Sequence, residues 1–189
     1  MAIGSDEKTR VTDVVAEYLQ NKGIEVEPHG PLTGQPMDWA DVAKAVGERV
    51  ASGAVDQGVL FCWTGTGTSI AANKVPGVRA ALCNDAETAR GARKWNDANI
   101  LVMSLRSTPE AVAREICDAW LEGQPDSAEL PVIDAREGGD ILIKIERGRG
   151  EFLIACSVET AYFMGGFDGL VDLEVVSVTR SKLDRRRSG

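Results

Sequence analysis

The part of this sequence best suited to chemistry is a cysteine followed closely by a glycine-rich turn. Residues 58–74, GVLFCWTGTGTSIAANK, read as a short buried strand, a turn and a helix. Cys62 stands where the strand ends, and Gly65 and Gly67 let the backbone turn sharply and approach a ligand. The candidate N-terminal caps of the helix are Thr66, Thr68 and Ser69. Free amides at a helix start favour negative charge, so we expect a thiolate or an oxyanion to be stabilised here.

The glycine-rich turn does not match two familiar phosphate-binding patterns. A Walker A loop ends in Gly-Lys-Ser/Thr, and Lys74 comes too late for that. A dinucleotide fingerprint needs a third small residue where Ile70 stands, and it follows the first strand rather than the third. Taken alone, the glycines also fit a tight turn that binds nothing, and Cys62 also fits a small buried apolar side chain.

Length, composition and charge limit the class of protein. The chain has 189 residues, which suits one ordinary α/β domain with an extension. Its net charge of −8 argues against general nucleic-acid binding, although a few arginines can still hold one phosphate. It contains neither a signal peptide nor an apolar run long enough for a membrane helix, so we expect a cytoplasmic protein without membrane contact. The four cysteines are far apart and His29 is the single histidine, so we expect no metal and no cofactor.

Alternating apolar strands and amphipathic helices predict a doubly wound, Rossmann-like α/β fold with a parallel five-stranded sheet. We expect strands at 2–6, 24–27, 58–61, 78–82 and 99–103, and helices at 9–22, 38–52, after the glycine turn, at 85–94 and at 107–121. Ligands of such sheets lie at the carboxyl ends of the strands. Four features of the sequence fall at such ends: Asp6, Cys62, Asn84 and the loop after Met103.

The character of the sequence changes after Gly123. We expect an α/β domain over 2–123, a polar linker at 124–130, an antiparallel β extension over 131–180 and a basic tail at 181–189. The extension either caps the domain or forms a dimer arm, or else it closes a neighbour's pocket with groups such as Arg147, Arg149 or Tyr162. The sequence leaves these alternatives open.

Two segments, SIAANKVPGVRAALCNDAETAR and WNDANIL, resemble the ribose-5-phosphate isomerase B and galactose-6-phosphate isomerase family. The opening IGSD, the segment DWADVAKAV and DAWL around Trp120 extend the resemblance over about residues 2–122. The resemblance implies a doubly wound α/β domain and a homodimer or homotetramer with active sites between subunits. It also implies a small-molecule substrate, through interconversion of an aldose phosphate and a ketose phosphate by way of an enediolate.

The resemblance also implies which residues form the site. Cys62 matches the cysteine base of many members, and the chain has no acid at Thr68, where another branch carries a glutamate base. The catalytic candidates are therefore Cys62, Thr64 and Asp6. The substrate-binding candidates are Gly65, Thr66, Gly67, Thr68, Ser69, Trp63, Trp95, Asn96, Arg106 and Trp39. The amides of residues 65–69 would stabilise the developing oxyanion, and Arg106 matches a family arginine that contacts phosphate.

The sequence departs from the family where the sugar is recognised. The histidine after Gly4-Ser5-Asp6 is lost, and Trp95 replaces the histidine that opens the sugar ring. An indole N–H can only donate, so Trp95 cannot open a ring. Trp63 replaces a glycine, and the C-terminal phosphate-binding arginine has no counterpart. We therefore expect a substrate other than ribose 5-phosphate, such as an open-chain or ketonic compound.

Two other functions remain compatible with these residues. One is a non-catalytic relative that binds a sugar or another metabolite, favoured by the lost ring-opening and phosphate groups. The other is an epimerase, decarboxylase or lyase that forms an enolate on the same scaffold. Exchange of a substrate proton in deuterated water distinguishes an enzyme from a binding module, and unchanged turnover in Cys62→Ala would exclude the cysteine mechanism.

Overall fold

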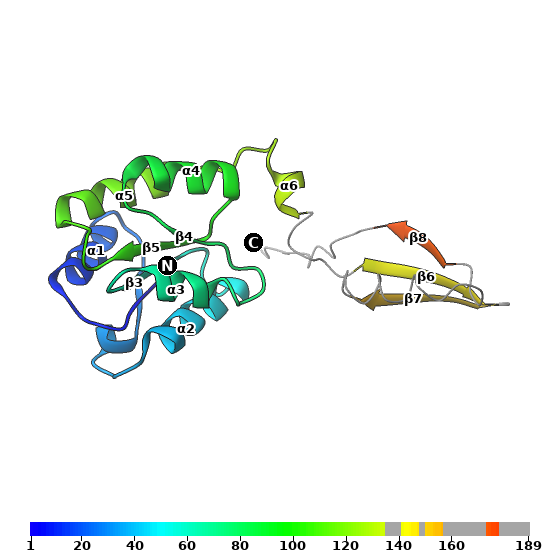
Figure 1. Cartoon of the computed structure of the whole chain (residues 1–189), viewed down its shortest axis with the longest axis horizontal. Coiled ribbons are helices and arrows are strands. Elements are labelled where there is room, and N and C mark those ends of the chain that lie inside the picture. The colour runs from blue at the N-terminus through cyan, green and yellow to red at the C-terminus, as the bar shows by residue number, and fades with distance from the viewer. Residues whose placement is uncertain (135–140, 148–149, 157–172, 178–189) are drawn as a thin grey trace. The chain divides into compact units, whose positions relative to one another are not determined.

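The computed structural model describes residues 1–134, 141–147, 150–156 and 173–177 (Figure 1). The chain divides into two compact units, Met1–Pro131 and Val132–Gly189. Every predicted site residue belongs to the first unit. The predicted basic tail, Arg149 and Tyr162 lie outside the described residues.

The first unit contains a five-stranded parallel sheet in the order β2-β1-β3-β5-β4, which confirms the predicted doubly wound α/β fold. Its strands are β1 (Ala2–Ser5), β2 (Glu27–His29), β3 (Gly58–Cys62), β4 (Ala80–Leu82) and β5 (Ile100–Ser104). Because β1 lies between β2 and β3, the strand order changes direction there. The crevice outside the carboxyl ends of β1 and β3 is therefore the expected ligand position.

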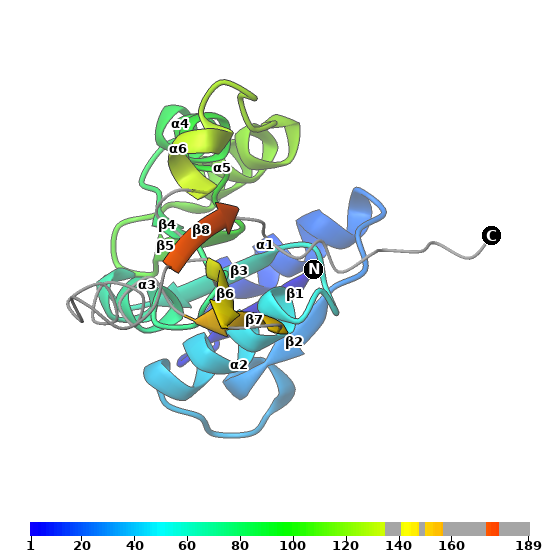
Figure 2. The same cartoon turned by 90° about the vertical axis from the view of Figure 1, so that its right-hand side faces the viewer.

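Helices cover both faces of this sheet (Figures 1 and 2). On one face lie α1 (Arg10–Asn21), α4 (Ala86–Asn96) and α5 (Glu110–Glu122), and on the other lie α2 (Trp39–Ala51) and α3 (Thr66–Ala72). A short 3-10 helix, η1 (Gly30–Thr33), follows β2. No helix in the described part of the chain is long and apolar enough to cross a membrane.

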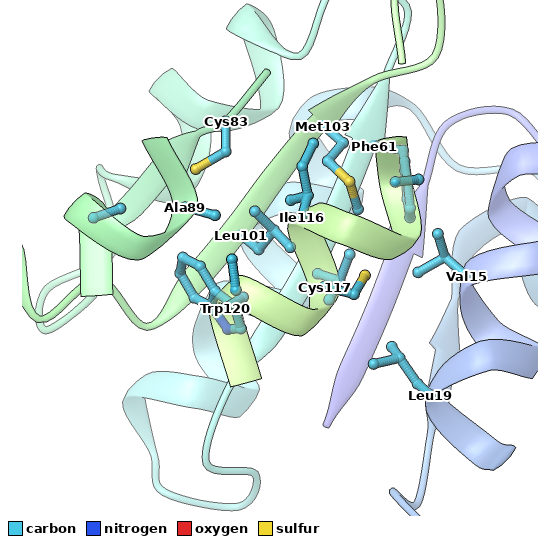
Figure 3. Packing of buried hydrophobic residues seen from close by; sticks show 14 of the residues in the cluster. Val15, Leu19, Phe61, Cys83, Ala89, Leu101, Met103, Ile116, Cys117 and Trp120 are labelled. Atoms are coloured by element: carbon cyan, nitrogen blue, oxygen red, sulfur yellow. The ribbon is translucent and has the colours of Figure 1, made fainter. Parts of the chain in front are cut away.

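The larger core cluster packs between the sheet and α1, α4 and α5 (Figure 3). Trp120 is fully buried in it, and its indole Nε1–H donates a 2.9 Å hydrogen bond to the side chain of Gln57. Cys83 and Cys117 lie in the same cluster, and burial raises the pKa of each thiol to about 12. Both cysteines are therefore packing residues rather than reactive thiols.

Helix starts follow their predicted caps on α2 and α4. The Asp38 carboxylate accepts from the amides of the first turn of α2, and the Asp85 carboxylate accepts from Thr88 at 2.7 Å. Thr9 caps α1 through a reciprocal pair of side-chain bonds with Thr12. These caps satisfy amides that would otherwise lack partners.

The second strand was predicted in the wrong place. We expected it at residues 24–27, but β2 spans Glu27–His29. Gly23, with a φ of +80°, ends α1 in a Schellman motif, and the amide of Ile24 bonds the carbonyl of Leu19 at 3.1 Å. Ile24 and Val26 pack on the core from this loop. Their apolar alternation reports side-chain burial and not strand pairing.

Smaller shifts affect two further elements. β4 begins at Ala80 rather than at Val78, because the Arg79 amide bonds the side chain of Asn99 instead of a strand partner. Pro109 occupies the N-cap of α5 rather than its first turn, and the helix begins at Glu110. Neither shift moves a side chain of the predicted site.

The second unit is described through its backbone. It contains β6 (Ile141–Arg147), β7 (Gly150–Cys156) and β8 (Leu173–Ser177), paired antiparallel in the order β7-β6-β8. This sheet agrees with the alternating pattern of the extension. A short helix, α6 (Leu130–Asp134), was not predicted and falls where the two units meet in the sequence.

Candidate functional site

The predicted catalytic residues meet at the carboxyl edge of the sheet. Asp6 directly follows β1 and Cys62 is the last residue of β3. These two strands are neighbours, with Ser5 opposite Phe61 in the register. The carboxylate and the thiol therefore lie at the carboxyl ends of two adjacent strands, where the strand order changes direction.

The Cys62 thiol is buried and accepts a backbone hydrogen bond. Its Sγ lies 3.2 Å from the amide nitrogen of Gly65, which donates to it. Gly65 has a φ of +78°, and a β-carbon there would collide with the side chain of Leu82 and lie 3.4 Å from the Met103 carbonyl. Only glycine combines this conformation with this close approach. An N–H aimed at the sulfur suits an atom that carries negative charge during a reaction.

The threonines of the turn do not cap α3, and that prediction was wrong. The N-cap is Gly65, and no side chain caps the helix. The Thr64 and Thr66 hydroxyls are exposed and lie 2.7 Å apart, so they bond each other. Thr68 is fully buried, and its hydroxyl donates to the Gly65 carbonyl at 3.3 Å. The Thr68 side chain thus supports the turn, and Thr64 and Thr66 present hydroxyls to solvent.

Two tryptophans and an arginine lie around the same turn. A β-carbon on Gly67 would be only 3.1 Å from the Trp39 ring, so that ring packs directly on the start of α3. Trp63 is 59% exposed immediately after the thiol. The backbone amide of Arg106 donates to the Trp63 carbonyl at 3.0 Å, and the Arg106 side chain is exposed beside it. The turn after Cys62 is therefore surrounded by the apolar rings of Trp39 and Trp63 and by the Arg106 cation.

Asp6 presents a partly buried carboxyl group. Its Oδ1 is buried and has no hydrogen-bond partner among the described residues. Burial raises the pKa of Asp6, with a smaller contribution from the neighbouring Glu7 carboxylate and an opposing one from a backbone N–H. A buried oxygen without a partner normally calls for a ligand or a water. The Asp6 carboxylate is thus free to bond a substrate hydroxyl.

Trp95 and Asn96 lie at the opposite edge of the sheet. They are the last two residues of α4, and the next strand, β5, begins at Ile100. Just before that strand, the Asn99 carbonyl accepts a hydrogen bond from the amide of Gly58, the first residue of β3. The length of β3, about 13 Å at the usual rise per residue, separates the two edges. A single chain therefore does not bring Asn96 to Cys62, and a site that uses both residues needs a second chain.

The turn that carries Asn96 is held firmly. Asp97 has a φ of +43°, a conformation rarely adopted by a non-glycine residue. Its carboxylate pairs with Arg79 at 2.7 Å and with Arg93 at 3.4 Å. Arg93 is almost fully buried and also donates to the Ala98 carbonyl. These bonds fix the backbone turn that directly follows Asn96.

The structure adds one residue that sequence reasoning missed. Ser104, the last residue of β5, is 3% exposed, and its hydroxyl donates to the Trp63 carbonyl at 2.9 Å. The available signal was a small polar residue at the end of an apolar strand. In the described part of the chain, no three His, Cys, Asp or Glu side chains gather as a metal site. His29 pairs instead with Glu27, 3.0 Å away.

Comparisons with known proteins identify the family and agree with the fold. A family model described as Ribose/Galactose Isomerase matches residues 1–130. The chain is 36% identical over 126 residues to D-erythrulose-4-phosphate isomerase of Pectobacterium atrosepticum, covering 66% of this chain and 83% of that protein. It is 39% identical over 110 residues to ribose-5-phosphate isomerase B of Escherichia coli, covering 58% and 74%. The solved structure of a ribose 5-phosphate isomerase from Thermotoga maritima superposes with a TM-score of 0.67 at 41% identity, covering 71% of this chain and 94% of that one.

Proposed function

The chain belongs to the ribose/galactose isomerase family, and we propose that it interconverts an open-chain aldose phosphate and its ketose phosphate, with Cys62 as the base. The observation that carries this proposal is the hydrogen bond from the Gly65 amide to the Cys62 sulfur, at the end of the strand that pairs with the one before Asp6. A packing thiol needs no such donor, whereas a thiolate that removes a proton is stabilised by one.

The reaction needs one group that removes a proton from carbon and returns it to the neighbouring carbon. The Cys62 thiolate takes the proton from the carbon next to the carbonyl, which leaves an enediolate. The resulting thiol then gives the proton to the former carbonyl carbon, while a second proton passes from the hydroxyl oxygen to the other oxygen. The Gly65 amide stabilises the sulfur in its charged form before the first step and after the second.

The surrounding groups bind the oxygens of the substrate. The unpartnered Oδ1 of Asp6 accepts a substrate hydroxyl, and the exposed Thr64 hydroxyl contacts the oxygen that exchanges its proton. The amides of residues 65–69 stabilise the enediolate oxygen. Arg106 supplies the positive charge for the phosphate group. These roles use each side chain in the chemistry of its type.

The substrate class follows from what the chain lacks. Trp95 stands where a histidine opens the ring in the family, and the Nε2 of the single histidine, His29, lies 3.0 Å from a carboxylate oxygen of Glu27. A four-carbon sugar 4-phosphate never closes a five-membered ring, because phosphate blocks the hydroxyl that would close it. One relative at 36% identity is a D-erythrulose-4-phosphate isomerase. A tetrose phosphate therefore suits this site better than ribose 5-phosphate.

The test is turnover of two substrates in deuterated water, followed by NMR. We expect D-erythrulose 4-phosphate to isomerise and to gain deuterium at the carbons that exchange. We expect ribose 5-phosphate to react about 10²–10⁴-fold more slowly, the usual contribution of a missing acid–base group. Equal or faster turnover of ribose 5-phosphate would overturn the substrate class, and exchange with neither sugar would overturn the isomerase assignment.

The placement of Asn96 suggests that the active site is shared between two chains of a homodimer or homotetramer. Asn96 at one edge would bind a substrate hydroxyl beside the Cys62 of a second chain. We expect Cys62→Ala and Asn96→Ala each to be nearly inactive alone and to regain turnover after subunit exchange, since mixed dimers keep one intact site. Failure to regain turnover, with mixed dimers present by native mass spectrometry, would place Asn96 outside the site.

A further inference from the structure

One carbonyl oxygen joins the loop of the thiol to the loop of the arginine. The Trp63 carbonyl accepts from the Arg106 amide at 3.0 Å and from the Ser104 hydroxyl at 2.9 Å. The Ser104 hydroxyl in turn accepts from the amide of Ser107 at 3.2 Å. The preceding carbonyl, that of Cys62, accepts a hydrogen bond from the amide of Leu105 at 3.0 Å. Two successive carbonyls at the thiol are thus held by the segment that follows β5.

Ser104 is placed to control this junction. It is the last residue of β5, it faces Cys62 in the strand register, and only 3% of it is exposed. Its hydroxyl is the one side-chain donor to the Trp63 carbonyl among the described residues. A peptide unit is planar, so a fixed Trp63 carbonyl also fixes the direction of the next amide. The chain then needs only Thr64 to bring the Gly65 amide to the sulfur.

We propose that Ser104 is a positioning residue of this site. Its hydroxyl fixes the Trp63 carbonyl, and through it the Gly65 amide on the Cys62 sulfur. Its effect on turnover rests on the proposed function, because it requires Cys62 to be the base. Its effect on the Gly65 amide does not, because that bond is present without substrate.

A matched control lies four residues further along. Thr108 belongs to the same loop and is 4% exposed, so it is as buried as Ser104. Its hydroxyl has no hydrogen-bond partner within the described residues. Thr108→Val therefore removes a buried hydroxyl from this loop without removing a bond to the thiol segment. A general effect of loop polarity would appear in both variants, and a positioning effect only at Ser104.

The experiment compares Ser104→Ala, Ser104→Thr and Thr108→Val in the full chain. NMR hydrogen exchange reports the Gly65 amide, and kinetics with D-erythrulose 4-phosphate separate kcat from KM. For Ser104→Ala we expect Gly65 exchange to rise about tenfold and kcat to fall about 10–10²-fold, as for a small displacement of a catalytic group. KM should change little, because Arg106 keeps its backbone bond. Ser104→Thr retains a hydroxyl and should restore both readouts, and Thr108→Val should match the wild type.

Each outcome bears on one of the two claims. Unchanged Gly65 exchange in folded Ser104→Ala would overturn the positioning role, whatever happens to turnover. Faster exchange in Ser104→Ala, with Thr108→Val unaffected, supports it even if the wild type turns over neither sugar, which would count only against the proposed function. If Ser104→Ala does not fold, Ser104→Cys gives the same readouts, since its thiol keeps the volume but donates weakly.

Discussion

The two strands on either side of β5 each lead into a helix through a cysteine, and the two thiols have opposite hydrogen-bond partners. Cys62 ends β3, and its sulfur accepts the Gly65 amide at the start of α3. Cys83 follows β4, is fully buried, and its thiol faces the Ala81 carbonyl as a weak donor. Burial and the nearby Asp85 carboxylate raise the pKa of Cys83 to about 12. The first sulfur meets a donor and the second meets an acceptor.

The helix starts differ in the same sense. Asp85 supplies its own negative charge to the first turn of α4, and the Thr88 amide lowers the pKa of that carboxyl. No side chain caps α3, where Gly65 is the N-cap. The start of α4 is capped by its own Asp85 side chain, whereas the start of α3 leaves uncapped backbone amides next to a thiol. Position at a strand end therefore does not distinguish the two cysteines, whereas the partner of each sulfur does.

The largest expected effect separates the two cysteines. Cys62→Ala should lower turnover by about 10²–10⁴-fold, the usual contribution of a general base. Cys83→Ala should keep turnover and lose about 1 kcal/mol of unfolding free energy, as for a small buried group. Steady-state kinetics and urea unfolding of both variants check this. A similar loss of turnover in both variants would show that Cys62 has no special role in proton transfer.

The next effect concerns the amide donor. Gly65→Ala should disturb the bond to the sulfur, because its β-carbon meets Leu82 and its φ of +78° is unfavourable. We expect turnover to fall about 10²-fold, as for a misplaced catalytic group. Gly77→Ala is the control, since Gly77 has a φ of +83° but open space around it. It should lose only the ~1–2 kcal/mol of a left-handed residue, measured by urea unfolding, and keep full turnover.

A third effect is the pH dependence of stability that the buried Cys83 thiol should cause. Because the pKa of Cys83 is raised on folding, its contribution to stability is present below the unfolded value of about 8.5 and is lost as pH rises toward 12. Between pH 8 and pH 10, wild type should therefore lose about 1–2 kcal/mol of unfolding free energy relative to Cys83→Ala. Urea unfolding at both pH values measures the difference. Parallel pH curves for the two proteins would show that Cys83 ionises normally in the fold.

The smallest effect concerns the caps. Asp85→Ala should lower the Tm by a few degrees at pH 7, because α4 loses its N-cap bond. The pKa of Asp85 is lowered on folding, so this advantage should persist above about pH 4 and vanish as pH falls through the folded value. Thr66→Ala should leave the Tm nearly unchanged, since no side chain caps α3. Calorimetry at pH 3 and pH 7 distinguishes the two helices.

Local patterns predicted most of the fold. The caps Asp38 and Asp85 and the apolar strands are signals within a few residues of one another, and the structure follows them. The error at Ile24 arose because alternation reports burial, and a loop that packs on the core alternates as a strand does. The helix end at Gly23 overrode the strand pattern because the Ile24 amide was already bonded.

The site was predicted less completely, because its parts are joined by tertiary contacts. The threonines of the turn were expected to cap α3, but Thr68 bonds backward to Gly65 and lies inside the protein. Ser104 carried no sequence signal specific enough to connect it with Trp63, which is 41 residues away. Asn96 lies within the WNDANIL segment that carries the family resemblance, but the resemblance does not say at which end of the sheet this residue lies.

The sheet, its helices and the thiol at a strand end all follow from the amino-acid sequence, because hydrophobic period and capping act over short distances. Which thiol has a donor follows from the folded chain alone, since Cys62 and Cys83 have similar positions in the sequence pattern. Hydrogen-bond partners depend on directions and distances of a few ångströms, which the folded chain sets and a linear pattern does not carry.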